Sequence, residues 1–181
     1  MILRFTVYGV AEAKGSTRAF HRPGMKAPVI TDSNRNVKAW QRLIADAAGG
    51  ALADLPDADR RLIAGGARVE VTYFLPRPKA LDRPKHAGAE HTKRPDLDKL
   101  TRAVLDALTS VAWTDDAQVI ELVACKRYAA LGHPAHVEIA VGPAALRHWQ
   151  SEAPARATDL LVDELAAIDA FKAAARRAGV I

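Results

Sequence analysis

The stretch "RPDLDKLTRAVLDAL", residues 94–108, decides the fold more than any other part of the chain. Its apolar residues recur at spacings of three and four: Leu97, Leu100, Val104 and Leu108. This spacing places them on one side of an α-helix. Asp96 follows Pro95 and occupies the N-cap position, where aspartate is favoured. The stretch therefore predicts an amphipathic helix from about Asp96 to Leu108.

Segments with alternating apolar residues on both sides of this helix predict the strands of a sheet. Four segments have this pattern: 2–10, 67–76, 117–130 and 133–142. A hairpin around Leu131 and Gly132 is expected to join the last two. Residues 36–51 have helical spacing and predict a second helix. The order β-α-β-α-β-β predicts an α+β fold, with a small mixed β-sheet packed with helices.

The remaining segments predict two loops and a terminal helix. Residues 11–28 combine Gly, Pro and Ser with basic residues, and residues 76–94 hold six Lys/Arg against two acids without helical or strand periodicity. Both segments predict loops, and the second is expected to be exposed. The composition becomes Ala-rich from Pro143 onward. We therefore expect a folded domain at 1–142 and a helical C-terminal extension at 143–181.

Composition and charge limit the class of protein. The chain has 181 residues, 49% of them apolar and 26% charged, with a formal net charge of +5. No apolar run approaches the roughly 20 residues of a membrane helix, and the single Cys125 excludes an internal disulfide. These features predict a soluble, cytoplasmic protein. The basic excess indicates either a polyanion partner, most simply nucleic acid, or an inert basic surface.

Acidic residues stand at two structured positions of this basic chain. Asp96 and Asp98 open the predicted helix, and Asp115 and Asp116 precede the next strand. One interpretation is structural, because helix caps, first turns and tight turns all favour aspartate. The other requires the chain after Leu108 to turn back, so that the two pairs meet. Clustered carboxylates without His or Cys would then bind a hard divalent ion, Mg²⁺ or Mn²⁺.

The run from 95 to 126 resembles the signature of the RusA family of Holliday junction resolvases, many of which are encoded by prophages. In that family an Asp-x-Asp-Asn opens a helix, a "DAL" follows within it, and a "W-x-DD-x-x-V" leads into a strand with a basic residue near its end. The matching residues are Asp96–Asp98, Asp106–Leu108, Trp113–Asp116 with Val119, and Lys126. "GVAEAKG" at 9–15 is similar to the family's opening, and the likeness extends over residues 1 to about 141.

The resemblance implies a homodimeric endonuclease that uses Mg²⁺, or Mn²⁺ as a substitute, to cut four-way DNA junctions by paired symmetric nicks. Asp96, Asp98 and Asp116 correspond to the family's catalytic, metal-binding acids. The family's catalytic lysine falls on Arg102, which can neutralise a phosphate but cannot give up a proton. The family's Asn after the acid pair is Lys99 in this chain.

Lys14 and Arg18, which flank a Gly15–Ser16 turn, are predicted to bind DNA, unless this is an ordinary solvated loop. DNA contacts are also predicted for Lys93, Arg94, Lys99 and Lys126. Trp113 is interpreted as a core anchor, and Asp106 as a partner of Arg102. No Gly-rich phosphate motif stands out, so no small-molecule substrate is predicted. Two rival functions stay open. One is a non-catalytic, structure-specific DNA-binding protein whose acids serve as helix caps, and the other is an interaction protein that assembles through the helix at 143–181.

Overall fold

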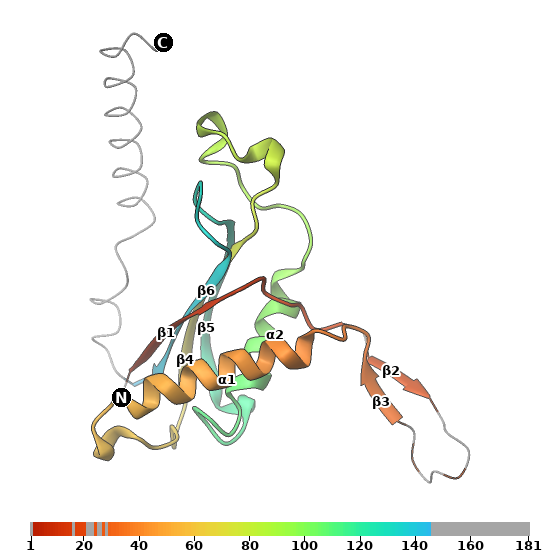
Figure 1. The fold of residues 1–181 in the computed structure, drawn as a ribbon. Helices are drawn as coiled ribbons and strands as arrows, with labels where there is room; N and C mark the ends of the chain where they lie inside the picture. The colour runs from red at the N-terminus through yellow and green to blue at the C-terminus, as the bar shows by residue number, and fades with distance from the viewer. Residues whose placement is uncertain (1, 16, 21–23, 25–26, 28, 146–181) are drawn as a thin grey trace. The chain divides into compact units, whose positions relative to one another are not determined.

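The structure is a computed structural model that describes residues 2–15, 17–20, 24, 27 and 29–145. All described residues lie in the first of the chain's two units, Met1–Ala145. The predicted C-terminal helix at 143–181 lies outside the described residues, except for its first three residues. Figure 1 shows the helices and strands of this unit.

The first unit contains six strands and two α-helices among its described residues. The strands are β1 (Leu3–Tyr8), β2 (Thr17–Phe20), β3 (Val29–Asp32), β4 (Ala67–Leu75), β5 (Val119–Tyr128) and β6 (His136–Pro143). The helices are α1 (Val37–Ala53) and α2 (Leu97–Leu108). Short 3₁₀ turns are η1 (Asp57–Asp59), η2 (Lys79–Leu81), η3 (Pro84–His86) and η4 (Asp116–Gln118). The two helices and four of the strands were predicted from the sequence periodicity.

Four strands form a mixed sheet in the order β1-β6-β4-β5. Strand β6 is antiparallel to both β1 and β4, whereas β4 and β5 are parallel. This confirms the predicted α+β class. The predicted hairpin between β5 and β6 is wrong, because β4 lies between them. Strand β4 is an inner strand of the sheet, and the residues on one of its faces are fully buried. After β5, the chain passes the end of β4, where the Ala129 amide donates to the Leu75 carbonyl at 2.8 Å.

Both helices pack on the same face of the sheet and enclose the core. The inward residues of β4 are almost inaccessible to solvent: Ala67, Val69, Val71, Tyr73 and Leu75. Helix α2 contributes Leu100 and Val104 to this core, and the Tyr73 hydroxyl lies 3.5 Å from Thr101 Oγ1 on α2. Burial raises the pKa of Tyr73 above its ordinary value. Trp113 is fully buried, as predicted for a core anchor, and its indole Nε1 donates to Thr109 Oγ1 at 3.3 Å.

Helix α2 connects two parallel strands and must therefore run antiparallel to them. At its beginning, Lys126 near the end of β5 reaches the carbonyl of Pro95. At its end, Trp113 bridges to Ile63, which precedes β4. The start of α2 thus lies at the C-terminal ends of β4 and β5, and its end lies where those strands begin.

Two segments predicted as loops have more structure than expected. Strands β2 and β3 form an antiparallel hairpin within 17–32, which projects from the sheet and helices in Figure 1. In the segment 76–94, the Arg77 guanidinium donates to the carbonyls of Ala129, His86 and Ala87 and so holds the η2–η3 region together. The sequence pattern missed this because the ordering bonds join side chain to backbone and have no periodicity.

We expect the core contact of α2 to carry much of the stability. Leu100→Ala should lower the free energy of unfolding by about 2–5 kcal/mol, because Leu100 is fully buried and its truncation leaves a cavity. The matched change Leu43→Ala on α1, where the side chain is 51% exposed, should cost less than about 1 kcal/mol. Urea denaturation of the full chain, followed by circular dichroism, measures both. Equal losses would contradict the packing described above.

Candidate functional site

The first turn of α2 presents two carboxylates to solvent. Asp96 is the N-cap residue, yet its side chain makes no capping hydrogen bond. Its Oδ2 lies 3.3 Å from Lys99 Nζ, one turn along the helix. Asp98 is exposed in the same turn, where the helix dipole favours a negative charge. The carboxylate of Asp96 therefore remains accessible for ligand binding instead of being used as a cap.

Lys126 fixes the segment that leads into this turn. Its Nζ donates to the carbonyls of Lys93 at 2.6 Å and Pro95 at 2.8 Å, and so joins the end of β5 to the start of α2. Beside it, the His91 ring lies 4.4 Å from the Tyr128 ring. Burial lowers the pKa of His91, and the nearby Lys126 charge acts in the same direction, so the imidazole is neutral at pH 7. Lys126 thus fixes the backbone just before Asp96 and so helps to position this residue.

A cleft of about 490 Å³ opens directly in front of Asp96. Its charged and polar lining residues are Glu12, Lys14, Asn34, Arg94, Asp96 and Lys99. On the opposite wall, the Asn34 side-chain amide donates to Glu12 Oε2 at 2.9 Å and to the Ala13 carbonyl at 2.9 Å. The contact between Asn34 and Glu12 in this wall was not predicted from the sequence. Glu12 lies within the family-like "GVAEAKG", but nothing in the sequence pairs it with Asn34.

Lys14 is held by the body of the protein. Its Nζ pairs with the Asp106 carboxylate, which also accepts from the Gln41 side-chain amide at 3.2 Å. Its backbone amide donates to the Lys99 carbonyl at 3.0 Å. Asp106 therefore pairs with Lys14 and not, as the sequence suggested, with Arg102. The resulting bonds dock the loop after β1 onto α2 and form one side of the cleft.

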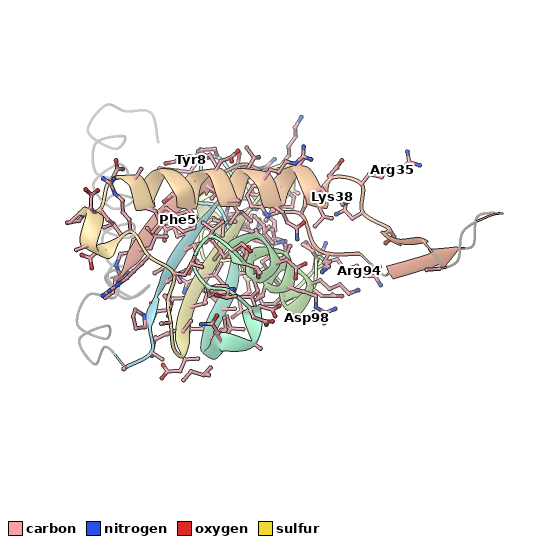
Figure 2. The ribbon with its side chains drawn as sticks, turned by 90° about the horizontal axis from the view of Figure 1, so that it is seen from below. Phe5, Tyr8, Arg35, Lys38, Arg94 and Asp98 are labelled. Atoms are coloured by element: carbon pink, nitrogen blue, oxygen red, sulfur yellow. The ribbon has the colours of Figure 1, made fainter. Side chains whose placement is uncertain are left out.

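Exposed basic side chains surround the acidic turn. Arg94 and Lys93 precede it, and Arg102 follows Asp98 by one helical turn. Helix α1 adds Lys38 and Arg42, which line a shallow depression together with Asp106. In Figure 2, Arg35, Lys38, Arg94 and Asp98 lie toward the same end of the molecule. The contribution from α1 was missed, although Lys38 and Arg42 are four residues apart and so share one helical face.

The second acidic pair lies at the opposite end of α2. Asp115 caps η4, since its side chain accepts from the Ala117 amide at 2.8 Å and Gln118 completes a capping box. This explains why two aspartates stand side by side: Asp115 has a structural role, which leaves Asp116 outside the cap and exposed. Asp116 begins η4, which leads directly into β5, whereas Asp96 and Asp98 lie beside the end of β5.

The three predicted metal ligands do not meet within one chain. Among the residues that the structure describes, no three His, Cys, Asp or Glu side chains lie close enough together to hold a metal ion. The exposed oxygens of Asp96 and Asp98 fit a hard divalent cation in chemical type, but they are only two of the three acids. Of the predicted DNA-binding residues, Lys93, Arg94 and Lys99 are exposed near these acids. Lys14 instead pairs with Asp106, and Lys126 donates to backbone carbonyls. The side chain of Arg18 is outside the described structure.

Comparison with known proteins identifies the family. The family described as endodeoxyribonuclease RusA matches residues 14–142. Among curated proteins, the "uncharacterized protein YqaN" of Bacillus subtilis (strain 168) is 28% identical over 133 residues, which cover 70% of this chain and 87% of that protein. No helix in the described part of the chain is long and apolar enough to cross a membrane. Since the match spans the cleft wall from Lys14 and the whole β4–α2–β5 unit, the chain belongs to the RusA family of endodeoxyribonucleases.

Proposed function

We propose that this protein is a divalent-metal-dependent endonuclease that resolves four-way DNA junctions by paired symmetric nicks. One observation carries the proposal: two accessible carboxylates, Asp96 and Asp98, stand at the start of α2, and Asp96 lines a cleft that also holds Lys14, Arg94 and Lys99. Carboxylate oxygens suit Mg²⁺ or Mn²⁺, and the basic side chains suit the phosphates that such an ion acts on. Family membership supports nuclease chemistry on DNA.

The chemistry assigns a separate task to each side chain. When bound, a divalent ion would screen the phosphate and make a coordinated water more acidic. Asp96 and Asp98 would hold it from one chain, with Asp116 as the third predicted ligand. Arg102, one turn beyond Asp98, would stabilise the charge that develops on the phosphate. Arg94 and Lys93 would hold the DNA backbone beside the cut.

The assembly follows from the substrate. A four-way junction is symmetric, and two strands must be cut at equivalent positions. A homodimer with one site in each half meets that requirement. We propose such a dimer, acting on DNA in the cytoplasm, with residues 1–142 as the nuclease domain and 143–181 as its helical extension.

The rival function, a DNA-binding protein whose acids serve as helix caps, is less consistent with the geometry. A capping aspartate accepts hydrogen bonds from the first amides of its helix. Asp115 does this, but Asp96 does not, although it occupies the N-cap position. The Asp96 side chain instead faces Lys99 and solvent, and metal binding is the use we propose for it.

Asp98→Asn should abolish junction cleavage while junction binding stays intact or tightens. The change removes a ligand charge next to the phosphate, and metal stabilisation worth several kcal/mol corresponds to a loss on the order of a thousandfold in rate. Cleavage of a synthetic four-way junction with Mg²⁺ or with EDTA, alongside a gel-shift assay, measures both properties. Asp46→Asn, on the exposed face of α1, is the control and should cleave normally. Wild-type cleavage by Asp98→Asn would contradict the proposed site.

The double change Lys38→Ala and Arg42→Ala should weaken junction binding without dependence on base sequence. Each lost phosphate contact removes about one unit from the slope of log K against log salt concentration, so the slope should become shallower by about two. Fluorescence anisotropy with a labelled junction at several salt concentrations gives that slope. Arg61→Ala, exposed beyond the far end of α1, should leave it unchanged. An unaltered slope in the double variant would remove α1 from the DNA-binding surface.

Lys99→Asn should lower the Mg²⁺ concentration that gives half-maximal cleavage, by about two- to fivefold. The Lys99 ammonium lies 3.3 Å from Asp96 and competes with any other cation there. The matched change Lys85→Asn, on an exposed residue of η3, removes the same charge away from the acids and should have no such effect. A Mg²⁺ requirement that rises or stays constant in Lys99→Asn would show that Lys99 does not compete with the metal.

A further inference from the structure

The wall of the cleft opposite Asp96 holds a carboxylate that the proposed metal chemistry does not use. Glu12 is half-buried there, and each of its oxygens accepts a hydrogen bond. Oε2 accepts from the Asn34 side-chain amide at 2.9 Å, and Oε1 accepts from the Asn36 side-chain amide at 3.3 Å. The Asn34 side-chain oxygen in turn accepts from the Asn36 backbone amide at 3.0 Å. These bonds fix the direction of the Glu12 carboxylate.

Glu12 keeps the capacity to bind a further hydrogen-bond donor. A carboxylate has about four acceptor positions, and the two asparagines use one on each oxygen. The neighbouring lysines are directed to other acids, since Lys14 pairs with Asp106 and the Lys99 ammonium lies 3.3 Å from Asp96. Within the described part of the chain, no three acids lie close enough together to hold a metal ion. A ligand that donates hydrogen bonds therefore suits this wall better than a metal ion does.

Small apolar groups line the cleft between its two walls. They belong to Val10, Ala11, Ala13 and Pro95. Val10 is 55% exposed, so the flat face of a ligand can cover it. The cleft volume of about 490 Å³ lies within the range of roughly 300–1,000 Å³ that is typical of sites for small organic ligands. Arg94 and Lys99 add positive charge on the side that carries Asp96. This combination matches the ring, the exocyclic amino group and the phosphate of a nucleotide.

A base that enters this cleft must first leave its stack. In a duplex each base lies between its neighbours, and its pairing edge is occupied by the opposite strand, so that a pocket can reach neither. Extrusion costs least where pairing is already weakened, as it is beside the strand exchange of a four-way junction. The cleft therefore fits an unpaired base next to the crossover.

We propose that the cleft binds one unpaired nucleobase of the strand whose phosphate lies at Asp96, and that Glu12 selects bases with an exocyclic amino group. Cytosine, adenine and guanine each present such a donor to a carboxylate. Thymine presents a single N–H between two carbonyl oxygens, which the carboxylate repels. In this arrangement Glu12 is a specificity-determining residue of the cut. The inference rests on the proposed function, because that function places the cut phosphate at Asp96.

Cleavage of a set of four-way junctions that vary one base at a time on both sides of the crossover tests the selection. With the wild-type protein, thymine at one position should slow cleavage by about tenfold or more relative to the three amino-bearing bases, because the bond to Glu12 is lost. Glu12→Gln has nearly the same shape and offers an amide donor to thymine, so the difference should fall below about threefold.

The matched control for this experiment is Glu90→Gln. It removes an exposed carboxylate that does not line the cleft, and it should keep the full discrimination against thymine. Equal rates for all four bases at every position would overturn the selection. A thymine penalty that survives Glu12→Gln at every position would do the same.

Unstacking of the base gives a readout that does not need cleavage. The fluorescent base 2-aminopurine is placed in turn at each position beside the crossover, and the junction is bound in EDTA. Binding of the wild-type protein should raise the fluorescence at least about twofold at one position, since unstacking relieves quenching by neighbouring bases. Among the described residues that line the cleft, none has an aromatic ring that would quench it again.

Glu12→Lys should abolish this rise, because an ammonium repels the amino donor, while fluorescence anisotropy still detects junction binding. Glu90→Lys, the matched charge reversal, should show the wild-type rise. A rise that persists in Glu12→Lys, or a wild-type protein that gives none at any position, contradicts the base site. A wild-type protein that gives the rise but cuts no junction refutes the proposed function and leaves the base site standing.

Discussion

The parallel pairing of β4 with β5 is the constraint on which the rest of the structure depends. Two neighbouring parallel strands need a connection that returns the chain to its starting end, and α2 provides it. The direction of α2 is then fixed, with its first turn beside the end of β5. Two hydrogen bonds from Lys126 hold that turn in place. The positions of Asp96 and Asp98 follow from this arrangement.

The same constraint separates residues that are close in sequence and joins others that are distant. Asp98 and Asp116 lie at opposite ends of the crossover, although only the helix and a short loop separate them. Conversely, Lys14 and Asp106 form an ion pair, and Glu12 meets Asn34 across the cleft. The cleft is therefore built from the loop after β1, the start of α1 and the start of α2. The proposed site would therefore use the helix to present its acids and the loops to shape its entrance.

Charge is distributed unevenly along the molecule. Lys93 and Arg94 lie beside the end of β5, Asp115 and Asp116 stand before its beginning, and Lys38 and Arg42 of α1 line a depression beside Asp106. The apolar middle of β5 lies between these ends.

The sequence by itself determined the two helices, the four sheet strands, the buried Trp113 and the family, because periodicity, caps and motif spacing are local properties. It also placed Asp96 and Asp98 on one helical turn, since that distance is set by helix geometry alone. Only the tertiary structure decided that β4 separates β5 from β6, that Lys126 and Lys14 hold other groups, and that Asp116 lies at the far end of α2. Those outcomes depend on strand order and chain direction. Both are decided by how the apolar faces pack together, and neither produces a periodic pattern in the sequence.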